Sequence, residues 1–237
     1  MTTKVKEKPL YLGHRERLRQ RFMVDEGASM PDYELLELLL TMAIPRRDVK
    51  DLAKTLINRF GDIGEVLHAP AHELMEAEVS PNAIVLLRLV ATCTMRCAYD
   101  GFHSSDKPIF SNWTQFEEYC RAKMAYKEVE EFRVFFLDAA HRLIGEKLIT
   151  TGTIDKSNIH PREIIRAALE NKAVYVILAH NHPSGNVEPS TADITMTKAF
   201  EELADVMDLK LFDHLILGRE GVFSFRAAGY IKTKKDK

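Results

Sequence analysis

The stretch YVILAHNHPSGNVEPSTAD, residues 175–193, joins an apolar run to two histidines, two prolines, a glycine and an aspartate. A plain turn or a plain helix start would need far less. The apolar residues 173–179 predict a central β-strand, and His180 and His182 at its end have the spacing that puts alternate side chains on one face. We therefore expect both imidazoles to point into the same pocket.

The loop and the helix start that follow indicate how a third side chain reaches these histidines. Ser190 precedes Asp193 by three residues at the opening of a predicted helix, and this spacing alone is typical of a capping box. A capping box does not account for the loop before it, where Pro183 and Pro189 fix φ at both ends and Gly185 permits a tight reversal. The loop predicts that the helix start folds back, so that two histidines and one aspartate converge.

Two imidazoles and one carboxylate form a ligand set suited to Zn²⁺, with the fourth tetrahedral position left for water. Bound Zn²⁺ lowers the pKa of its water to about 7 and polarises a carbonyl group, so this set suits hydrolysis of an amide or ester. Ser190, one helical turn before Asp193, is placed to donate a hydrogen bond to the developing oxyanion.

The composition favours a cytoplasmic protein. Its 237 residues can bury a hydrophobic core without disulfides, and the formal net charge of -2 gives no general attraction to nucleic acid. No apolar run approaches the roughly 18 residues of a membrane span, and the N-terminal segment lacks the apolar core of a signal peptide. Cys93, Cys97 and Cys120 form no Cys-x-x-Cys pair, so we expect reduced thiols that are small buried side chains.

Apolar periodicity divides the chain near residue 100. Helical spacing runs from residue 32 to about residue 99, and Asp32 and Asp48 stand where helix N-caps belong. We therefore predict an N-terminal helical domain over residues 1–100. The predicted helices cover residues 32–44, 48–60, 63–68, 71–78 and 81–95, with breaks at Pro45, Gly61 and Pro81.

Strands and helices mix in the remainder of the chain, which predicts an α/β domain over residues 101–232 and a basic tail at 233–237. Residues 99–112 are rich in turn formers and are expected to be a linker. The predicted helices are 113–127, 160–172 and 190–206, and the predicted strands are 132–138, 142–150, 173–180, 210–218 and 221–229, with the first two strands forming a hairpin.

The pattern His180-x-His182, followed by Pro183, Gly185, Pro189, Ser190 and Asp193, resembles the JAMM motif of the JAB/MPN metalloprotease superfamily, in particular its RadC (UPF0758) branch. Segments 132–144, 152–169 and 213–218 are also similar to RadC segments, as are 13–22 and 32–62 in the leader. The resemblance implies an α/β fold in which a helix-hairpin-helix-like N-terminal bundle precedes a cytidine-deaminase-like JAB/MPN domain with a central mixed sheet. It also implies a zinc-dependent metallopeptidase or isopeptidase acting on a peptide or protein.

By this resemblance His180, His182 and Asp193 are the zinc ligands and Ser190 assists the oxyanion. The superfamily also uses a glutamate just before the first strand of the domain as the general base. Glu128, Glu130 and Glu131 lie there, and the Glu-x-Phe spacing of RadC-like sequences selects Glu130. Glu131 is the alternative, because strand alternation lets only one of these two neighbours face the metal.

Four further features have ordinary structural interpretations beside functional ones. Glu146, on the second strand, is expected to face solvent, and Asp213 and His214 are expected to make structural hydrogen bonds in place of a second metal site. The segment GTIDKSNIHPREI, residues 152–164, is either a substrate-binding edge or an ordinary loop before a helix.

The leader carries the nucleic-acid alternative. The RadC leader resembles a helix-hairpin-helix module, whose glycine turn presents N–H groups to a phosphate, and the family is associated with DNA repair. Here Ser80 and Pro81 replace the glycines, and proline removes a donor. Basic residues nevertheless gather at 13–22. The alternatives to a hydrolase are therefore a DNA-associated binding module and a catalytically silent MPN interaction scaffold.

Overall fold

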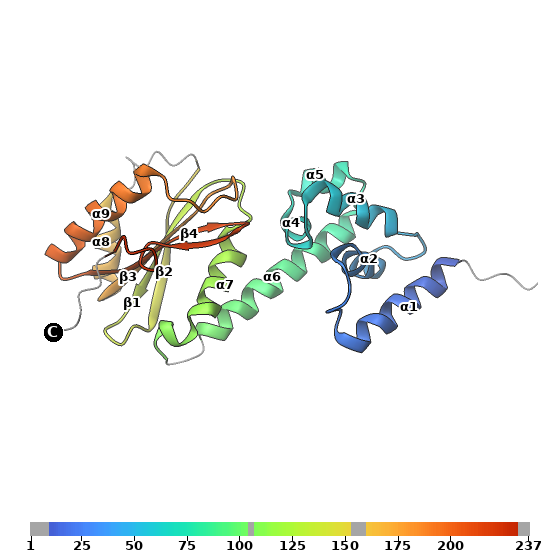
Figure 1. Cartoon of the computed structure of the whole chain (residues 1–237), viewed down its shortest axis with the longest axis horizontal. Helices are drawn as coiled ribbons and strands as arrows, with labels where there is room; N and C mark the ends of the chain where they lie inside the picture. The colour runs from blue at the N-terminus through green and yellow to red at the C-terminus, as the bar shows by residue number, and fades with distance from the viewer. Residues whose placement is uncertain (1–9, 104–106, 153–159, 232–237) are drawn as a thin grey trace, which may run out of the picture. The chain divides into compact units, whose positions relative to one another are not determined.

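The computed structural model describes residues 10–103, 107–152 and 160–231, and the chain divides into two compact units, 1–93 and 94–237 (Figure 1). The first unit is helical, as predicted, and its core consists largely of leucine, valine and alanine side chains. Its helices are α1 (Leu10–Asp25), α2 (Asp32–Ala43), α3 (Lys50–Phe60), α4 (Ile63–His68), α5 (Ala71–Glu76) and the first part of α6 (Pro81–His103).

The predicted N-caps at Asp32 and Asp48 are wrong by one residue each. Pro31 is the N-cap of α2, with φ -68° and ψ 156°, and Val49 is the N-cap of α3. The Asp32 carboxylate instead accepts a hydrogen bond of 3.1 Å from the Ile63 N–H at the start of α4. Asp32 therefore accepts one of the N–H groups left unpaired at the start of another helix. No local sequence pattern indicates this contact.

The turn before α6 shows the structural role of Ser80 and Pro81 in this chain. The Ser80 carbonyl accepts the Ile84 N–H at 3.0 Å, and Pro81 is the first residue of α6, where a missing N–H costs little. The left-handed residue of this turn is Glu78, with φ 60°. Ser80 and Pro81 therefore start a helix.

The linker predicted over residues 99–112 is wrong in its first part, because α6 continues to His103. Met95, Ala98 and Tyr99 pack against a buried cluster of the second unit, which stabilises the helix beyond its predicted end. The cysteine prediction is also wrong in part, since Cys120 is buried but Cys93 and Cys97 are exposed on α6. Within the described ranges, no helix is both long and apolar enough to cross a membrane.

The second unit contains a five-stranded mixed sheet in the order β2-β1-β3-β4-β5, with β3 at its centre as predicted. β3 runs parallel to β4, and the β1–β2, β1–β3 and β4–β5 pairs are antiparallel, which confirms the hairpin. The strands are β1 (Glu131–Leu137), β2 (Leu143–Thr151), β3 (Tyr175–Asn181), β4 (Lys210–Gly218) and β5 (Gly221–Ser224). The other elements are η1 (Ile109–Asn112), α7 (Trp113–Met124), α8 (Pro161–Glu170) and α9 (Thr191–Val206).

Helices cover both faces of this sheet (Figure 1). Phe132, Val134 and Phe136 of β1 pack on the side of α8 and α9, whereas Phe135 and Leu137 pack on the side of α7. This alternation follows from the two-residue period of a strand. A polar residue of β1 therefore lies on the α8 and α9 face if it is an even number of residues from Phe132, and on the α7 face if it is an odd number.

Candidate metal centre

His180 and His182 lie at the end of β3 and beyond it. His180 is 1% exposed and pairs across the sheet with Phe132, which places its side chain on the α8 and α9 face. His182 follows the strand, and its N–H donates to the Leu217 carbonyl of β4 at 2.9 Å. The end of β4 therefore fixes the backbone that carries the second imidazole.

The loop after His182 reverses sharply against the end of β4. Gly185 has φ +89°, and its N–H donates to the His182 carbonyl at 2.9 Å. A Cβ at Gly218 would lie 2.2 Å from the Gly185 carbonyl oxygen, so glycine is required for this close approach. The two glycines allow the loop to return toward the strand, as predicted from Gly185.

Asp193 stands in the first turn of α9 and is fully buried. The Ser190 N–H and Oγ–H both donate to Asp193 Oδ2, at 2.8 and 2.5 Å, and the Asp193 N–H donates to Ser190 Oγ at 3.2 Å. This is a complete capping box. It uses Oδ2 and turns Oδ1 toward His180 Nε2, at 3.0 Å, so the capping and ligand interpretations of Asp193 are compatible.

The three side chains converge with Glu130. The two Nε2 atoms of His180 and His182 are 3.1 Å apart, and Glu130 Oε1 lies 4.0 Å from His180 Nε2. Among the described residues, one ligand atom from each of Glu130, His180 and His182 falls within 4.8 Å of the others. Two imidazole nitrogens beside carboxylate oxygens are a donor set that fits Zn²⁺ and other divalent ions that bind imidazole.

The adjacent glutamates lie on different faces of the sheet. Glu130 is two residues before Phe132, so its side chain points to the same face and toward the histidines. Glu131 points to the α7 side, where it pairs with Lys127 at 3.4 Å and Arg133 at 2.9 Å. Glu128 is exposed. Of the three glutamates, Glu130 is the one that the structure brings to the histidines.

The expectation that Glu146 faces solvent is wrong. It is three-quarters buried beside α7, where it accepts a hydrogen bond of 2.9 Å from the Tyr119 hydroxyl and pairs with Lys123. Burial and this carboxylate raise the pKa of Tyr119. No sequence pattern links these three residues, because two of them come from a helix and one from a strand.

Asp213 and His214 have different surroundings. Asp213 accepts hydrogen bonds from the Ser224 hydroxyl at 2.6 Å and the Arg226 N–H at 2.9 Å, in agreement with a structural role. His214 Nε2 lies 2.9 Å from His180 Nδ1. Sequence reasoning missed this contact with the candidate metal centre. The proposed substrate edge at 152–164 cannot be compared, since residues 153–159 lie outside the described ranges.

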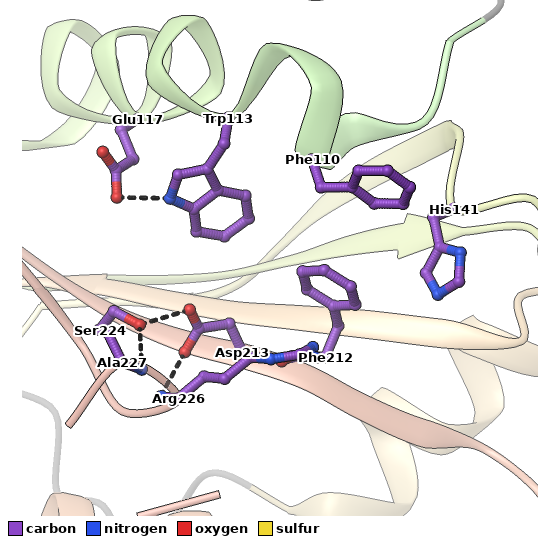
Figure 2. A pocket seen from close by; sticks show the side chains of 9 residues that line it. All are labelled: Phe110, Trp113, Glu117, His141, Phe212, Asp213, Ser224, Arg226 and Ala227. Atoms are coloured by element: carbon purple, nitrogen blue, oxygen red, sulfur yellow. Dashed lines mark hydrogen bonds between the residues drawn. The ribbon is translucent and has the colours of Figure 1, made fainter. Parts of the chain in front are cut away.

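A cavity of about 690 Å³ lies on the α7 side of the sheet, opposite the face that carries His180 (Figure 2). The aromatic side chains that line it include Trp113 and Phe212. The Trp113 Nε1–H donates to Glu117 at 2.7 Å, and the Arg226 guanidinium lies 4.5 Å from the centre of the Phe212 ring. Asp213 also lines it, and burial raises the pKa of that carboxyl. None of the four converging side chains lines this cavity, so it is separate from the candidate metal centre.

The sequence is similar to that of known proteins. Residues 110–230 match the family model of the RadC-like JAB domain. A UPF0758 protein of Ruegeria pomeroyi is 42% identical over 225 residues, which are 94% of this chain and 100% of that protein. The matched residues contain Glu130, His180, His182 and Asp193.

Proposed function

Because the chain belongs to the RadC (UPF0758) family of the JAB/MPN superfamily, we propose that its α/β domain is a zinc-dependent hydrolase of the JAMM type. Its substrate would be an amide bond in a peptide or protein, cleaved as by a metallopeptidase or isopeptidase. The supporting observation is that His180, His182, Asp193 and Glu130 come from three separate segments and meet at one place. Buried imidazoles and carboxylates in such a cluster are typical of a metal site.

Each side chain would have a defined part. The Nε2 atoms of His180 and His182 and Oδ1 of Asp193 would hold the metal, because Asp193 Oδ2 is already bound by Ser190. Zn²⁺, when bound, supplies Lewis acidity toward a carbonyl group and toward water. Glu130 would accept a proton from the attacking water at its carboxylate and return it to the leaving amine.

The oxyanion role of Ser190 requires a change of hydrogen bond. Its hydroxyl donates to Asp193 Oδ2 at 2.5 Å, so the same proton cannot simultaneously reach a substrate oxygen. If the hydroxyl turns toward the substrate, the Ser190 backbone N–H still holds Asp193 Oδ2 at 2.8 Å. Ser190 would then stabilise the oxyanion without releasing the carboxylate.

Metal content is the first test of this proposal. Elemental analysis of protein prepared without chelator or a metal-affinity tag is expected to give about one zinc per chain in the wild type, and none in a folded His182→Ala variant. A wild type that holds no zinc, and into which none can be loaded, would overturn the proposal.

Catalysis is tested separately with the zinc-loaded protein and a peptide library, with new amino termini and released lysine side chains identified by mass spectrometry. Glu130→Gln is expected to keep zinc and to lose about 10²–10⁴-fold in cleavage rate, because a general base is removed. Glu128→Gln is the matched control, since Glu128 is exposed in the same segment. Equal cleavage by Glu130→Gln would exclude Glu130 as the base, and zinc binding without any cleavage would favour the silent scaffold.

The structure of the basic helix α1 gives little support to the nucleic-acid alternative. Arg15 donates to the Ile44 carbonyl at 3.0 Å, and Arg21 pairs with Glu34 at 2.6 Å, so two of its cations are engaged within the first unit. Salt-dependent DNA binding that persists in His180→Ala would nevertheless favour a DNA-associated module.

A further inference from the structure

We propose that His214 and Thr197 are positioning residues that hold His180 as the tautomer whose Nε2 lone pair faces the metal. This inference rests on the metal-binding part of the proposed function. It assigns a role to a histidine and a threonine that are not themselves among the proposed ligands.

A continuous line of short contacts leads from His180 into the start of α9. His180 Nδ1 lies 2.9 Å from His214 Nε2, and His214 Nδ1 lies 2.7 Å from Thr197 Oγ1. Thr197 Oγ1 in turn lies 2.6 Å from the Asp193 carbonyl oxygen. His180, His214, Thr197 and Asp193 are each no more than 1% exposed, so bulk water does not replace these partners.

The carbonyl at the end of this line fixes the direction of every hydrogen bond. A carbonyl oxygen only accepts, so the Thr197 hydroxyl proton must lie in the 2.6 Å contact with the Asp193 carbonyl. Thr197 Oγ1 then accepts from His214 Nδ1–H, and Nε2 of the neutral His214 ring, which carries a single N–H, accepts from His180 Nδ1–H. The proton of His180 is thus on Nδ1, and Nε2 is left to coordinate.

His182 reaches the same state through a different carbonyl. Its Nδ1 lies 2.8 Å from the Asn186 carbonyl oxygen, so Nδ1 carries the proton and Nε2 faces His180 Nε2 at 3.1 Å. The Nε2 atoms of both histidines are therefore turned toward the proposed metal position by two independent sets of hydrogen bonds. The set of hydrogen bonds that orients His180 ends on the backbone carbonyl of Asp193, the residue whose carboxylate is the third proposed ligand.

Aromatic packing holds the intermediate ring of this line in place. Phe225 stacks on His214 with ring centroids 4.6 Å apart and an interplanar angle of 17°, and Phe132 lies 5.9 Å away. Rotation of the His214 ring would break these contacts and both hydrogen bonds. His214 is therefore able to keep its two nitrogens directed at His180 and Thr197.

The Thr197→Val variant removes the hydroxyl while keeping the shape of the side chain. His214 Nδ1–H then loses its acceptor, and the favoured arrangement moves the His214 proton to Nε2, where it donates to His180 Nδ1. The remaining His180 proton is then on Nε2, the coordinating atom. Metal affinity is expected to fall about 10–100-fold, as for other partners that orient metal ligands.

Thr195→Val is the matched control. Thr195 is exposed on the same helix, and its hydroxyl donates to the Thr191 carbonyl at 2.8 Å, which is the same local bond that Thr197 makes to Asp193. Its hydroxyl takes no part in the contacts that join His180, His214 and Thr197. Thr197→Ser retains the hydroxyl and is expected to bind metal within about 2-fold of the wild type, because the orienting hydrogen bonds survive.

The experiment measures Co²⁺ and Zn²⁺ dissociation constants by competition with a chelator, together with the visible spectrum of the Co²⁺ protein. Weaker binding by Thr197→Val alone would support the inference. Unchanged affinity in Thr197→Val, or an equal loss in Thr195→Val, would overturn it while leaving the proposed function intact. If Thr197→Val does not fold, His214→Phe removes the acceptor while keeping a ring between Phe132 and Phe225.

A second readout needs no metal. In protein labelled with ¹⁵N-histidine, long-range proton–nitrogen correlation spectra identify which ring nitrogen carries the proton. The metal-free wild type is expected to show His180 protonated at Nδ1, and an unprotonated Nδ1 would overturn the inference. A wild type that binds neither metal would refute the proposed function, and this spectrum would still decide the orientation of His180.

Discussion

Replacement of Gly218 by alanine is expected to disturb the candidate metal centre through the loop that joins His182 to Asp193. The new Cβ would lie 2.2 Å from the Gly185 carbonyl oxygen and 2.8 Å from a Val187 methyl carbon, whereas real Cβ contacts essentially never fall under 3.0 Å. The carbonyl must therefore retreat by at least 0.8 Å, the difference between 3.0 and 2.2 Å. Because the obstacle is backbone, we expect a loss of about 2–3 kcal/mol, in the upper part of the range for overpacking.

The displaced carbonyl belongs to the loop that joins His182 to Asp193, so metal affinity should fall with stability. Calorimetry should show a Tm about 4–12 °C lower than that of the wild type, from about 2–4 °C per kcal/mol. Gly145→Ala is the control, because the nearest atom to its Cβ is the side-chain oxygen of Asn171, at 3.1 Å, which can move aside, and Phe136 Cδ2 at 3.7 Å is an ordinary contact. A Gly218→Ala protein with wild-type Tm and zinc affinity would refute this account of the loop.

Three further predictions concern charge, a helix end and metal. Burial raises the pKa of Asp213 above 3.8, so this carboxyl stabilises the fold fully below that pH and loses its contribution as the pH rises through the raised value. The Tm of Asp213→Asn should therefore rise relative to that of the wild type as the pH increases from about 4, and a constant difference would contradict this. Asp32→Ala should cost about 0.5–2 kcal/mol in urea unfolding, because the Ile63 N–H loses its acceptor, and an unchanged midpoint would exclude the cap. Zn²⁺ at 100 times its Kd should stabilise the wild type by about 2.7 kcal/mol and leave His182→Ala unchanged in thermal melts, and equal shifts would place the metal elsewhere.

Much of the fold and the candidate site was predictable because the deciding signals are local. Alternation along β3 brings His180 and His182 together, and the prolines and glycine of the following loop lie between the histidines and Asp193. The Glu-x-Phe spacing of RadC-like sequences selects Glu130, and strand alternation explains why its neighbour Glu131 lies on the other face. These inferences depend only on spacing along one strand or one loop.

The contact between His214 and His180 depends instead on an irregularity between strands. Val176 pairs with Leu211, but Ile177 pairs with Asp213, so β4 has one extra residue at this point. That residue puts His214 opposite Leu178, on the face of His180, and leaves Asp213 on the opposite face. No feature of the sequence marks the irregularity, and the role of His214 therefore required the three-dimensional register.

The two oxygens of the Asp193 carboxylate have different nearest partners, and this bears on how such a domain could lose the proposed metal site in evolution. Oδ2 accepts from Ser190 at the start of α9 and lies 3.6 Å from His182 Nε2, whereas Oδ1 lies closer to a histidine, 3.0 Å from His180 Nε2. Asparagine in place of Asp193 would keep one acceptor oxygen for the helix and present an amide NH₂ to the histidine. A single nucleotide change that converts aspartate to asparagine would thus remove the proposed ligand oxygen while sparing the fold. If the proposed function holds, a folded domain without the metal site lies one substitution away.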